Sequence, residues 1–208
     1  MNERLKRHLQ RTDVTRKGAR RVSEILEAGA AILLDEGFMS LTKRRIATRL
    51  GISHGNVSYY FPTRESLWQA VFEYELQDYY ERHHLQDRSL AGNAQLEFDA
   101  FILRRIDAYR NRKTRAFFAQ VSAFSEVNEN ILLLRNENYE MLYQHTLARV
   151  GALVPHADEL ALRPRVLAII ALLDGLHAVA VYRPDALVDG DSFPQYLVER
   201  ANAIARGT

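Results

Sequence analysis

Apolar residues recur every three to four positions along most of this chain, and no segment shows the sustained alternation of a half-buried strand. Spacing of this kind gathers apolar side chains on one face of an α-helix. Only five prolines interrupt the 208 residues. We therefore predict an all-α fold of about nine helices, long enough to enclose a substantial core.

Turn residues divide this pattern into separate helices, since glycine, proline and asparagine favour helix ends and loops. The first long helix is predicted at 17–36, ended by Gly37, and a long fourth helix begins after its cap, Thr63. The later helices are predicted at 94–110, 113–126, 129–153, 160–183 and 192–206.

Residues 42–61 contain two short apolar-periodic segments on either side of a glycine-centred turn. Thr42 and Ser53 are suited to cap these segments, because a side-chain hydroxyl can accept a hydrogen bond from a backbone N–H one turn on. Gly51 can adopt the left-handed conformation that ends the first segment, and Val57 anchors the second. The pattern predicts a helix-turn-helix, although a surface helical hairpin would share it.

The second helix of this unit leaves His54, Gly55, Asn56, Ser58 and Tyr59 facing outward. In a helix-turn-helix, the N-terminal residues of the second helix reach base edges in the major groove of DNA. Asparagine can pair with adenine, and histidine can donate to guanine N7 or O6. Glycine would let the backbone come close to the duplex.

Charge is unevenly distributed along the chain. The first 66 residues carry thirteen basic and seven acidic side chains, a net charge of +6, whereas the remainder carries −4 and the whole chain +2. A basic region gains affinity for polyanions by releasing their counterions. Because this region contains the predicted helix-turn-helix, we expect double-stranded DNA to be the partner.

Residues 16–68 resemble the DNA-binding domain of the tetracycline-repressor (TetR) family of transcriptional regulators. The resemblance rests on spaced elements, which are Gly37-Phe38, Thr42, Ile46-Ala47, Gly51-Ile52-Ser53, Gly55, Phe61 and the Arg64-x-x-Leu67 start of the fourth helix. It implies an N-terminal three-helix helix-turn-helix domain followed by a helical ligand-binding and dimerisation domain. It further implies a dimeric repressor that a small-molecule effector releases from a palindromic operator.

One position departs from the family. Members often carry a phosphate-binding tyrosine where this chain has Ser58, so Ser58, Tyr59 or Tyr60 is left to make that contact. Arg64 stands where the family has a lysine that touches the DNA backbone. The expected DNA-binding residues are Thr42, Lys43, Arg44, Ser53, His54, Gly55, Asn56, Ser58, Tyr59, Tyr60 and Arg64.

Residues 166–182 are apolar on almost every face. A membrane span is disfavoured because the segment is short and has Asp174 and His177 near its centre, where charge is costly. A partner subunit can cover such a helix, and TetR-like proteins dimerise through their last two helices. The expected dimer interface contains Val166, Ile169, Ile170, Leu173, His177, Phe193, Tyr196, Leu197 and Ile204.

Aromatic and polar side chains of the C-terminal region could line the effector pocket that the resemblance implies, since such pockets are mostly apolar with few polar anchors. The candidates are Trp68, Phe72, Phe117, Phe118, Phe124, Tyr139, Tyr143, His145, His177 and Tyr182. Aromatic residues at helical spacing are equally consistent with an ordinary core. His177 beside Asp174 can form a core pair, anchor a ligand or contact a second subunit.

The sequence does not support a catalytic, cofactor-binding or metal-binding role. Cysteine is absent, which excludes a thiol nucleophile and fits a reducing compartment. No phosphate-loop, nucleotide-binding or zinc-protease motif occurs. The pair His83-His84 is a poor metal site, because adjacent helical residues point about 100° apart. The N-terminus lacks the apolar segment of a signal peptide, so we expect a cytoplasmic protein.

The expected organisation is a flexible basic arm at 1–15, a helix-turn-helix domain at 16–66 and a helical effector-binding and dimerisation domain at 67–208. The arm is either a disordered tail or a segment that follows the DNA backbone or minor groove. Two alternatives to a ligand-responsive repressor stay open. One is a DNA-binding regulator whose C-terminal domain binds a protein, and the other is a helical enzyme or carrier.

Overall fold

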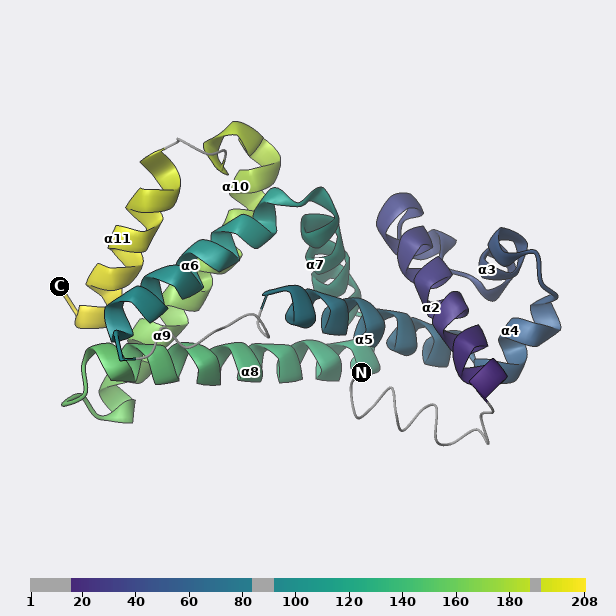
Figure 1. Cartoon of the computed structure of the whole chain (residues 1–208), viewed down its shortest axis with the longest axis horizontal. Helices are drawn as coiled ribbons and strands as arrows, with labels where there is room; N and C mark the ends of the chain where they lie inside the picture. Colours follow the sequence, from purple (N-terminus) through teal and green to yellow (C-terminus); the bar gives the residue numbers. More distant parts are fainter. Residues whose placement is uncertain (1–15, 84–91, 188–191) are drawn as a thin grey trace. The chain divides into compact units, whose positions relative to one another are not determined.

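The computed structural model describes residues 16–83, 92–187 and 192–208, and within these ranges the chain is helical with no strand (Figure 1). The predicted all-α class is therefore confirmed. The predicted arm at 1–15 lies outside the described residues. The N-terminal elements are α2 (Arg16–Glu36), η1 (Phe38–Ser40), α3 (Lys43–Leu50), α4 (His54–Tyr60) and α5 (Arg64–His83). The later elements are α6 (Ala94–Arg110), α7 (Arg112–Ser125), α8 (Glu129–Leu153), α9 (Glu159–Asp174), α10 (Leu176–Tyr182), η2 (Pro184–Leu187) and α11 (Ser192–Arg206).

The chain folds into two compact units that are discontinuous in sequence. The N-terminal unit contains the described residues up to Arg82 together with Ala116–Leu134. The C-terminal unit contains His83–Arg115 and Arg135–Thr208. Both α7 and α8 therefore contribute residues to each unit.

In the N-terminal unit, α2 packs against both the helix-turn-helix and α5. Its inward residues Val22, Ile25 and Leu33 are fully or almost fully buried, as their helical spacing predicts. Gly29 lies at a close crossing of α2 and α5, since a Cβ atom placed there would sit 2.6 Å from Val71 Cγ2. A glycine is required at this crossing because any side chain would displace a packed neighbour.

An aromatic cluster joins α5 and η1 to the part of α7 that belongs to the same unit. The Phe38 ring lies 4.3 Å from Trp68 and 3.7 Å from Phe124, measured between centroids. Phe72 extends the cluster to Phe117 at 5.7 Å. Aromatic pairs at these separations stabilise a core beyond the area that they bury.

In the C-terminal unit, α11 packs against α6 and α9 around an aliphatic and aromatic core. Gly175 divides the predicted helix at 160–183 into α9 and α10. The Gly175 N–H still donates to the Ala171 carbonyl oxygen at 3.0 Å, and Val179 N–H donates to the Gly175 carbonyl at 3.2 Å. The helical hydrogen bonding thus continues through the break between α9 and α10. The break falls at glycine, the residue that departs from regular helix geometry at the lowest conformational cost.

The stretch Glu159–Tyr182 is long and apolar enough to cross a membrane, judged by length and composition alone. Core helices of soluble proteins satisfy the same criterion. Here only 33% of its most apolar window is buried. One face therefore packs into the C-terminal unit, and the opposite face presents apolar side chains at the surface.

Candidate nucleic-acid interface

Two hydroxyl caps define the starts of α3 and α4. Thr42 Oγ1 accepts a hydrogen bond from the Arg45 backbone N–H at 3.1 Å, and Ser53 Oγ accepts one from Asn56 N–H at 3.2 Å. Both capping residues have extended backbones. The capping predicted from sequence is confirmed, and each cap satisfies a backbone donor that the helix leaves unpaired.

The turn between the two helices is fixed by a glycine and by apolar anchors. Gly51 has φ 65° and ψ 32°, the left-handed conformation predicted for it. The Ile52 N–H then donates to the Ala47 carbonyl at 3.0 Å, which closes the end of α3. Ile46, Ala47 and Val57 are buried, so α4 is held against α3 and can present only its other face.

The outward face of α4 carries the residues expected to read bases. His54, Gly55 and Asn56 are exposed, and Tyr59 retains 71% of its accessible surface. Ser58 is half-buried, with its Oγ 3.4 Å from His54 Nδ1. This contact limits the orientations of the His54 ring, whose tautomer decides which nitrogen donates.

Tyr59 and Tyr60 form a pair at the C-terminal end of α4. Their rings meet edge to face with centroids 5.0 Å apart. Tyr60 is half-buried, whereas Tyr59 extends into solvent. The assignment of the phosphate contact among Ser58, Tyr59 and Tyr60 stays a prediction.

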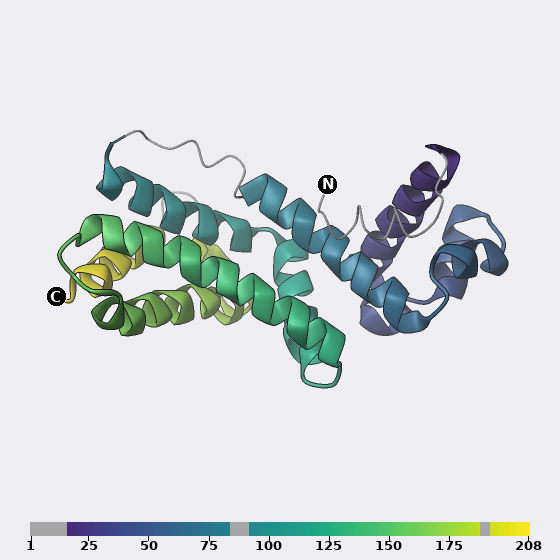
Figure 2. The ribbon, with the colours of Figure 1, turned by 90° about the horizontal axis from the view of Figure 1, so that it is seen from below.

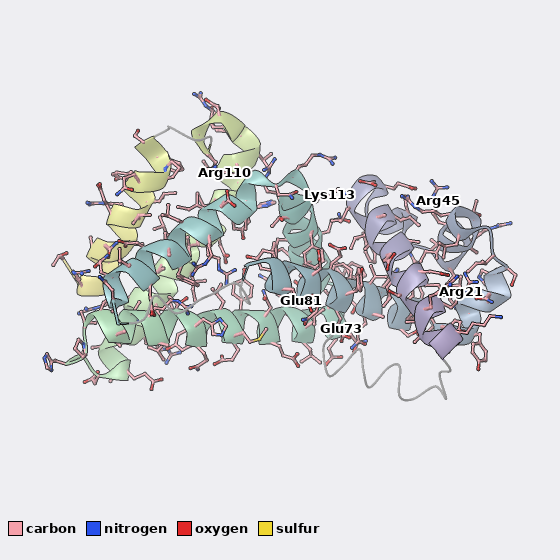
Figure 3. All side chains as sticks on the ribbon, viewed as in Figure 1. Arg21, Arg45, Glu73, Glu81, Arg110 and Lys113 are labelled. Carbon is pink, nitrogen blue, oxygen red and sulfur yellow. The ribbon has the colours of Figure 1, made fainter. Side chains whose placement is uncertain are left out.

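Basic side chains around the helix-turn-helix differ in whether they already form hydrogen bonds or ion pairs within the protein. Lys43 Nζ donates to the Pro62 carbonyl oxygen at 2.5 Å, tying the start of α3 to the loop before α5. Arg44 is exposed. Arg21 on α2 and Arg45 on α3, both labelled in Figure 3, belong to the N-terminal unit, and Arg21 forms a 2.6 Å ion pair with Glu24.

Glu36 binds two arginines of α3. Arg45 makes two hydrogen bonds of 2.8 Å to the two Glu36 carboxylate oxygens, and Arg49 lies 3.6 Å from one of them. The hydrogen bonds from Arg45 lower the pKa of Glu36, and the charges of Arg45 and Arg49 act in the same direction. Sequence reasoning missed this cluster, because Glu36 precedes the Gly37 turn and its reach to α3 depends on how the turn folds.

Arg64 begins α5 and stacks on the aromatic cluster. Its guanidinium carbon lies 4.2 Å from the centroid of the Trp68 ring, a cation–π distance. The predicted Thr63 cap is confirmed, since Thr63 Oγ1 accepts from Ser66 N–H at 3.0 Å. The Trp68 indole N–H donates to the Leu41 carbonyl oxygen at 3.0 Å. Neither contact of Trp68 could be inferred from its position in the sequence.

The residues expected to line an effector pocket divide between the two units. Five of them belong to the N-terminal unit, where they pack on one another or on Tyr79; these are Trp68, Phe72, Phe117, Phe118 and Phe124. Tyr139, Tyr143, His145, His177 and Tyr182 belong to the C-terminal unit. The predicted residues therefore do not all line one pocket within either unit.

A cavity of about 540 Å³ lies between α8 and α9 in the C-terminal unit. Figure 2 shows these helices side by side. The volume falls in the range of small-molecule sites. The cavity is lined by Asn136, Tyr139, Glu140, Tyr143, Gln144, Glu159, Arg163, Leu167 and Ile170. Two predicted pocket residues, Tyr139 and Tyr143, thus share one cavity.

Tyr139 lines this cavity, and its hydroxyl donates to Asp174 Oδ2 at 2.7 Å. Burial raises the pKa of Asp174, although the Tyr139 hydrogen bond and the nearby side chains of Arg105, Arg135 and His177 oppose that shift. Burial and the bond to Asp174 raise the pKa of Tyr139 to about 12. Asp174 therefore accepts its hydrogen bond from Tyr139. His177 Nδ1 is buried without a hydrogen-bond partner.

Most residues expected at a dimer interface lie inside the protomer. Val166, Ile169, Ile170, Leu173 and Leu197 are at most 7% exposed and belong to the core of the C-terminal unit. Phe193 and Ile204 are partly buried against that core, His177 is half-buried, and Tyr196 is 54% exposed. The large exposed apolar residues of α9 and α10 are instead Leu160, Leu167, Val181 and Tyr182.

Among the described residues, no group of three or more histidine, aspartate or glutamate side chains could hold a metal ion. Of the histidine pair considered above, His84 and the side chain of His83 lie outside the described part of the chain.

Comparison with known proteins agrees with this geometry. The family described as bacterial regulatory proteins, tetR family, matches residues 25–71. This match spans the C-terminal half of α2, η1, α3, α4 and the start of α5. No curated protein matches the chain.

Solved structures of transcriptional regulators share the fold over nearly the whole chain. One from Pseudomonas aeruginosa PAO1 is 19% identical over 90% of this chain and 89% of its own, with a TM-score of 0.74. A TetR transcription regulator from Haloarcula marismortui ATCC 43049 is 18% identical over 91% and 98%, with a TM-score of 0.73. A regulator from Saccharomonospora viridis, crystallised with choline, is 17% identical over 90% and 96%, with a TM-score of 0.71.

Proposed function

The chain belongs to the TetR family of bacterial regulatory proteins, and we propose that it is a dimeric repressor released from a palindromic DNA operator by a small-molecule effector. Its class as a DNA-binding transcriptional regulator follows from the family match and the fold. We assign it no catalytic activity and no cofactor, and we place it in the cytoplasm.

Gly55 carries the argument for DNA recognition by α4. A Cβ atom at this position would meet only Ser53 Oγ, at 3.9 Å, so the fold itself has room for a side chain. The left-handed conformation that favours glycine elsewhere is also absent here. A glycine that the protein does not need is explained by close approach of an outside partner, and the backbone of a recognition helix approaches DNA in this way.

The neighbouring residues take roles that follow from their chemistry. His54 and Asn56 reach base edges, where their donors and acceptors can distinguish base pairs. Thr42, Arg44 and Arg64 contact phosphates and set the register of the protein on the duplex. Ser53, Ser58, Tyr59 and Tyr60 contribute further polar contacts at the ends of α4, and Lys43 orders the loop before α5.

An exposed apolar stripe supports the dimer. Leu160, Leu167, Val181 and Tyr182 are 80%, 49%, 65% and 81% exposed along α9 and α10. Large apolar side chains left exposed along a helix mark a candidate interaction site, and a second copy provides a matching surface by two-fold symmetry. Tyr196 of α11 extends the interface, whereas the buried residues named earlier support it from within the protomer. The two recognition helices of such a dimer would lie about 34–36 Å apart, one turn of DNA.

This dimer also accounts for the length and apolar character of α9 and α10 without a membrane. Asp174 lies near the centre of the stretch and receives the Tyr139 hydrogen bond from α8. A carboxylate with a partner inside the protein fits a helix covered by protein, since an ionised carboxylate is costly in lipid.

The cavity between α8 and α9 is the candidate effector site. Its volume suits a small molecule, and its two tyrosines and several polar side chains can orient one. The choline complex of the Saccharomonospora viridis regulator supports an effector of similar size. The alternative is a C-terminal domain that answers to a protein partner.

The test is to select duplexes that the full-length protein binds from a random library, and then to titrate the complex with a panel of small metabolites that includes choline. We expect a palindromic sequence, and release of it by at least one compound. Substituting His54, Asn56 and Tyr59 together with alanine should cost roughly 1–3 kcal/mol for each good base contact. Selection of no sequence would contradict the proposal, whereas release by no compound would favour the protein-binding alternative.

A further inference from the structure

We propose that Trp68 is a positioning residue for DNA binding, which holds the Arg64 guanidinium for its phosphate and sets the distance between the starts of α3 and α5. This inference rests on the proposed DNA-binding function. It concerns one residue that the sequence suggested for an effector pocket. All the residues that carry it belong to the N-terminal unit.

The first observation is the stack itself. Arg64 is exposed at the first position of α5, and its guanidinium carbon lies 4.2 Å from the Trp68 ring centroid one turn further along the helix. A free surface arginine loses conformational entropy when it binds a ligand. Stacking orders the side chain before binding. Because the N–H groups lie in the guanidinium plane, a stacked arginine still presents them to a phosphate.

The second observation is that Trp68 is itself held from several sides. The residue is only 8% exposed. Its ring meets Phe38 and Phe124 at centroid distances of 4.3 and 4.9 Å, with interplanar angles of 61° and 85°. The indole N–H donates to the Leu41 carbonyl at 3.0 Å. The face on which Arg64 stacks therefore has a fixed orientation.

The third observation is the position of the residue whose carbonyl accepts the hydrogen bond from the Trp68 indole. Leu41 directly precedes Thr42, the cap of α3. One tryptophan thus connects the phosphate-binding arginine of α5 to the backbone beside the N-terminus of α3. The bond from Lys43 Nζ to the Pro62 carbonyl makes a second connection between the same two helix starts. Phosphates are regularly spaced along a duplex, so two contact points must keep a fixed separation.

The experiment uses the full-length protein and a fluorescently labelled 30-base-pair duplex of random sequence, so it does not need the operator. Affinity is measured by anisotropy in about 50–200 mM salt, the range over which phosphate contacts dominate. The variants are Arg64→Ala, Trp68→Leu, Trp68→Phe and the double variant Arg64→Ala with Trp68→Leu. Circular dichroism and thermal unfolding report whether each variant folds.

We expect Arg64→Ala to weaken binding and to reduce the slope of log K against log salt by about 0.9 for each phosphate that the protein no longer neutralises. Trp68→Leu should weaken binding about two- to fivefold in the wild-type background, as removal of a cation–π interaction predicts. It should have no further effect when Arg64 is already alanine. Trp68→Phe keeps an aromatic face and should bind within about twofold of wild type.

A second measurement needs no change at Trp68, which is the single tryptophan of the chain. Its fluorescence should change when the duplex binds, because a phosphate then approaches the stacked guanidinium. In Arg64→Ala, that change should vanish while anisotropy still detects binding at low salt. This measurement decides the question even if Trp68→Leu fails to fold.

The outcomes separate the two proposals. If the wild-type protein binds neither this duplex nor a selected one, the DNA-binding function fails. If wild type binds and Arg64→Ala weakens binding, the function stands. An equal loss of affinity from Trp68→Leu in both backgrounds, or a tryptophan signal that persists in Arg64→Ala, would then overturn the positioning role and leave Trp68 as a core residue.

Discussion

The Tyr139 hydroxyl on α8 lies 2.7 Å from Asp174 Oδ2 at the C-terminal end of α9, so one hydrogen bond joins the two helices that line the cavity. The phenol is the donor, and its pKa of about 12 keeps it protonated through the neutral range. The carboxylate accepts this bond in a partly buried site. Its ionisation should therefore affect both the stability of the C-terminal unit and the shape of the cavity.

We expect Asp174→Asn to change how stability depends on pH. Burial raises the pKa of Asp174 above its ordinary value of 3.8, so the folded protein binds the proton more tightly than the unfolded chain. The stabilising effect of protonation is complete below pH 3.8 and is lost as the pH rises through the raised pKa. Wild type should therefore gain stability relative to the variant as the pH falls from about 7 toward 4.

Urea unfolding at several pH values measures this difference. At neutral pH, the two proteins should differ by no more than about 1–2 kcal/mol, because asparagine can still accept the Tyr139 hydrogen bond. A relative loss of wild-type stability on acidification would show that Arg105, Arg135 and His177 outweigh burial at Asp174.

Gly55→Ala should separate folding from DNA binding. The fold has room for the added methyl group, and alanine favours a helix over glycine by up to about 1 kcal/mol. We expect unchanged or slightly raised thermal stability together with at least a roughly tenfold loss of operator affinity, about 1.4 kcal/mol. Both are measured on the same preparation, by calorimetry and by anisotropy.

Gly151→Ala is the matched control. Gly151 is also helical, and a Cβ atom there would lie 3.7 Å from Leu162 Cδ1, an ordinary contact. This variant should gain similar stability and bind DNA as wild type does. Normal operator binding by Gly55→Ala would mean that α4 approaches the duplex less closely than proposed.

Glu36→Gln should raise the affinity for duplexes of any sequence. The substitution removes the carboxylate that binds Arg45 and Arg49, which frees both guanidinium groups for phosphates. We expect a steeper dependence of log K on log salt, by up to about 0.9 for each arginine that reaches a phosphate. Specific and random duplexes should be compared under the same salt series.

Glu27→Gln on α2 removes the same charge without touching α3, since Glu27 accepts instead from Ser23. Equal effects of the two substitutions would show that net charge alone acts, and would argue against a specific role of Glu36 in restraining the arginines.

Val181→Glu combined with Tyr182→Glu should convert the dimer to a monomer. Both side chains are exposed on the apolar stripe, and two new charges on each protomer would meet their counterparts across a two-fold interface. Sedimentation velocity should show the change, and operator affinity should fall because one head then binds without the other.

Val127→Glu is the corresponding control, because Val127 is 79% exposed but belongs to the N-terminal unit. It should leave the dimer intact. A dimer that persists in the Val181 and Tyr182 variant would place the interface on another surface.

Local chemistry could be predicted from the sequence, and tertiary contacts could not. The caps at Thr42 and Ser53 and the turn at Gly51 depend on residues at most a few positions apart, and all three are confirmed. The contacts of Trp68 with Leu41 and of Lys43 with Pro62 span 27 and 19 positions, so they depend on packing that no short pattern records.

The same limit explains the apolar helix near the C-terminus. The apolar sequence of α9 and α10 indicated that other protein surfaces must bury this segment. It could not show which of its faces packs inside the protomer. Val166 and Ile169 proved to be enclosed, whereas Leu167 on the same helix is exposed. A periodicity of 3.6 residues has little meaning when every position is apolar, because no polar face marks the outside.

The aromatic cluster has a consequence for anyone who exchanges parts between regulators of this kind. Phe38, Trp68 and Phe72 take Phe117 and Phe124 as neighbours, and these two lie about 35 to 40 positions beyond the end of α5. A fragment cut after α5 would leave these rings open to water. Chimaeras that give this chain a new DNA-sequence preference should therefore exchange residues 116–134 together with the first 82 residues. Natural recombination at a single crossover would separate aromatic rings that fold together.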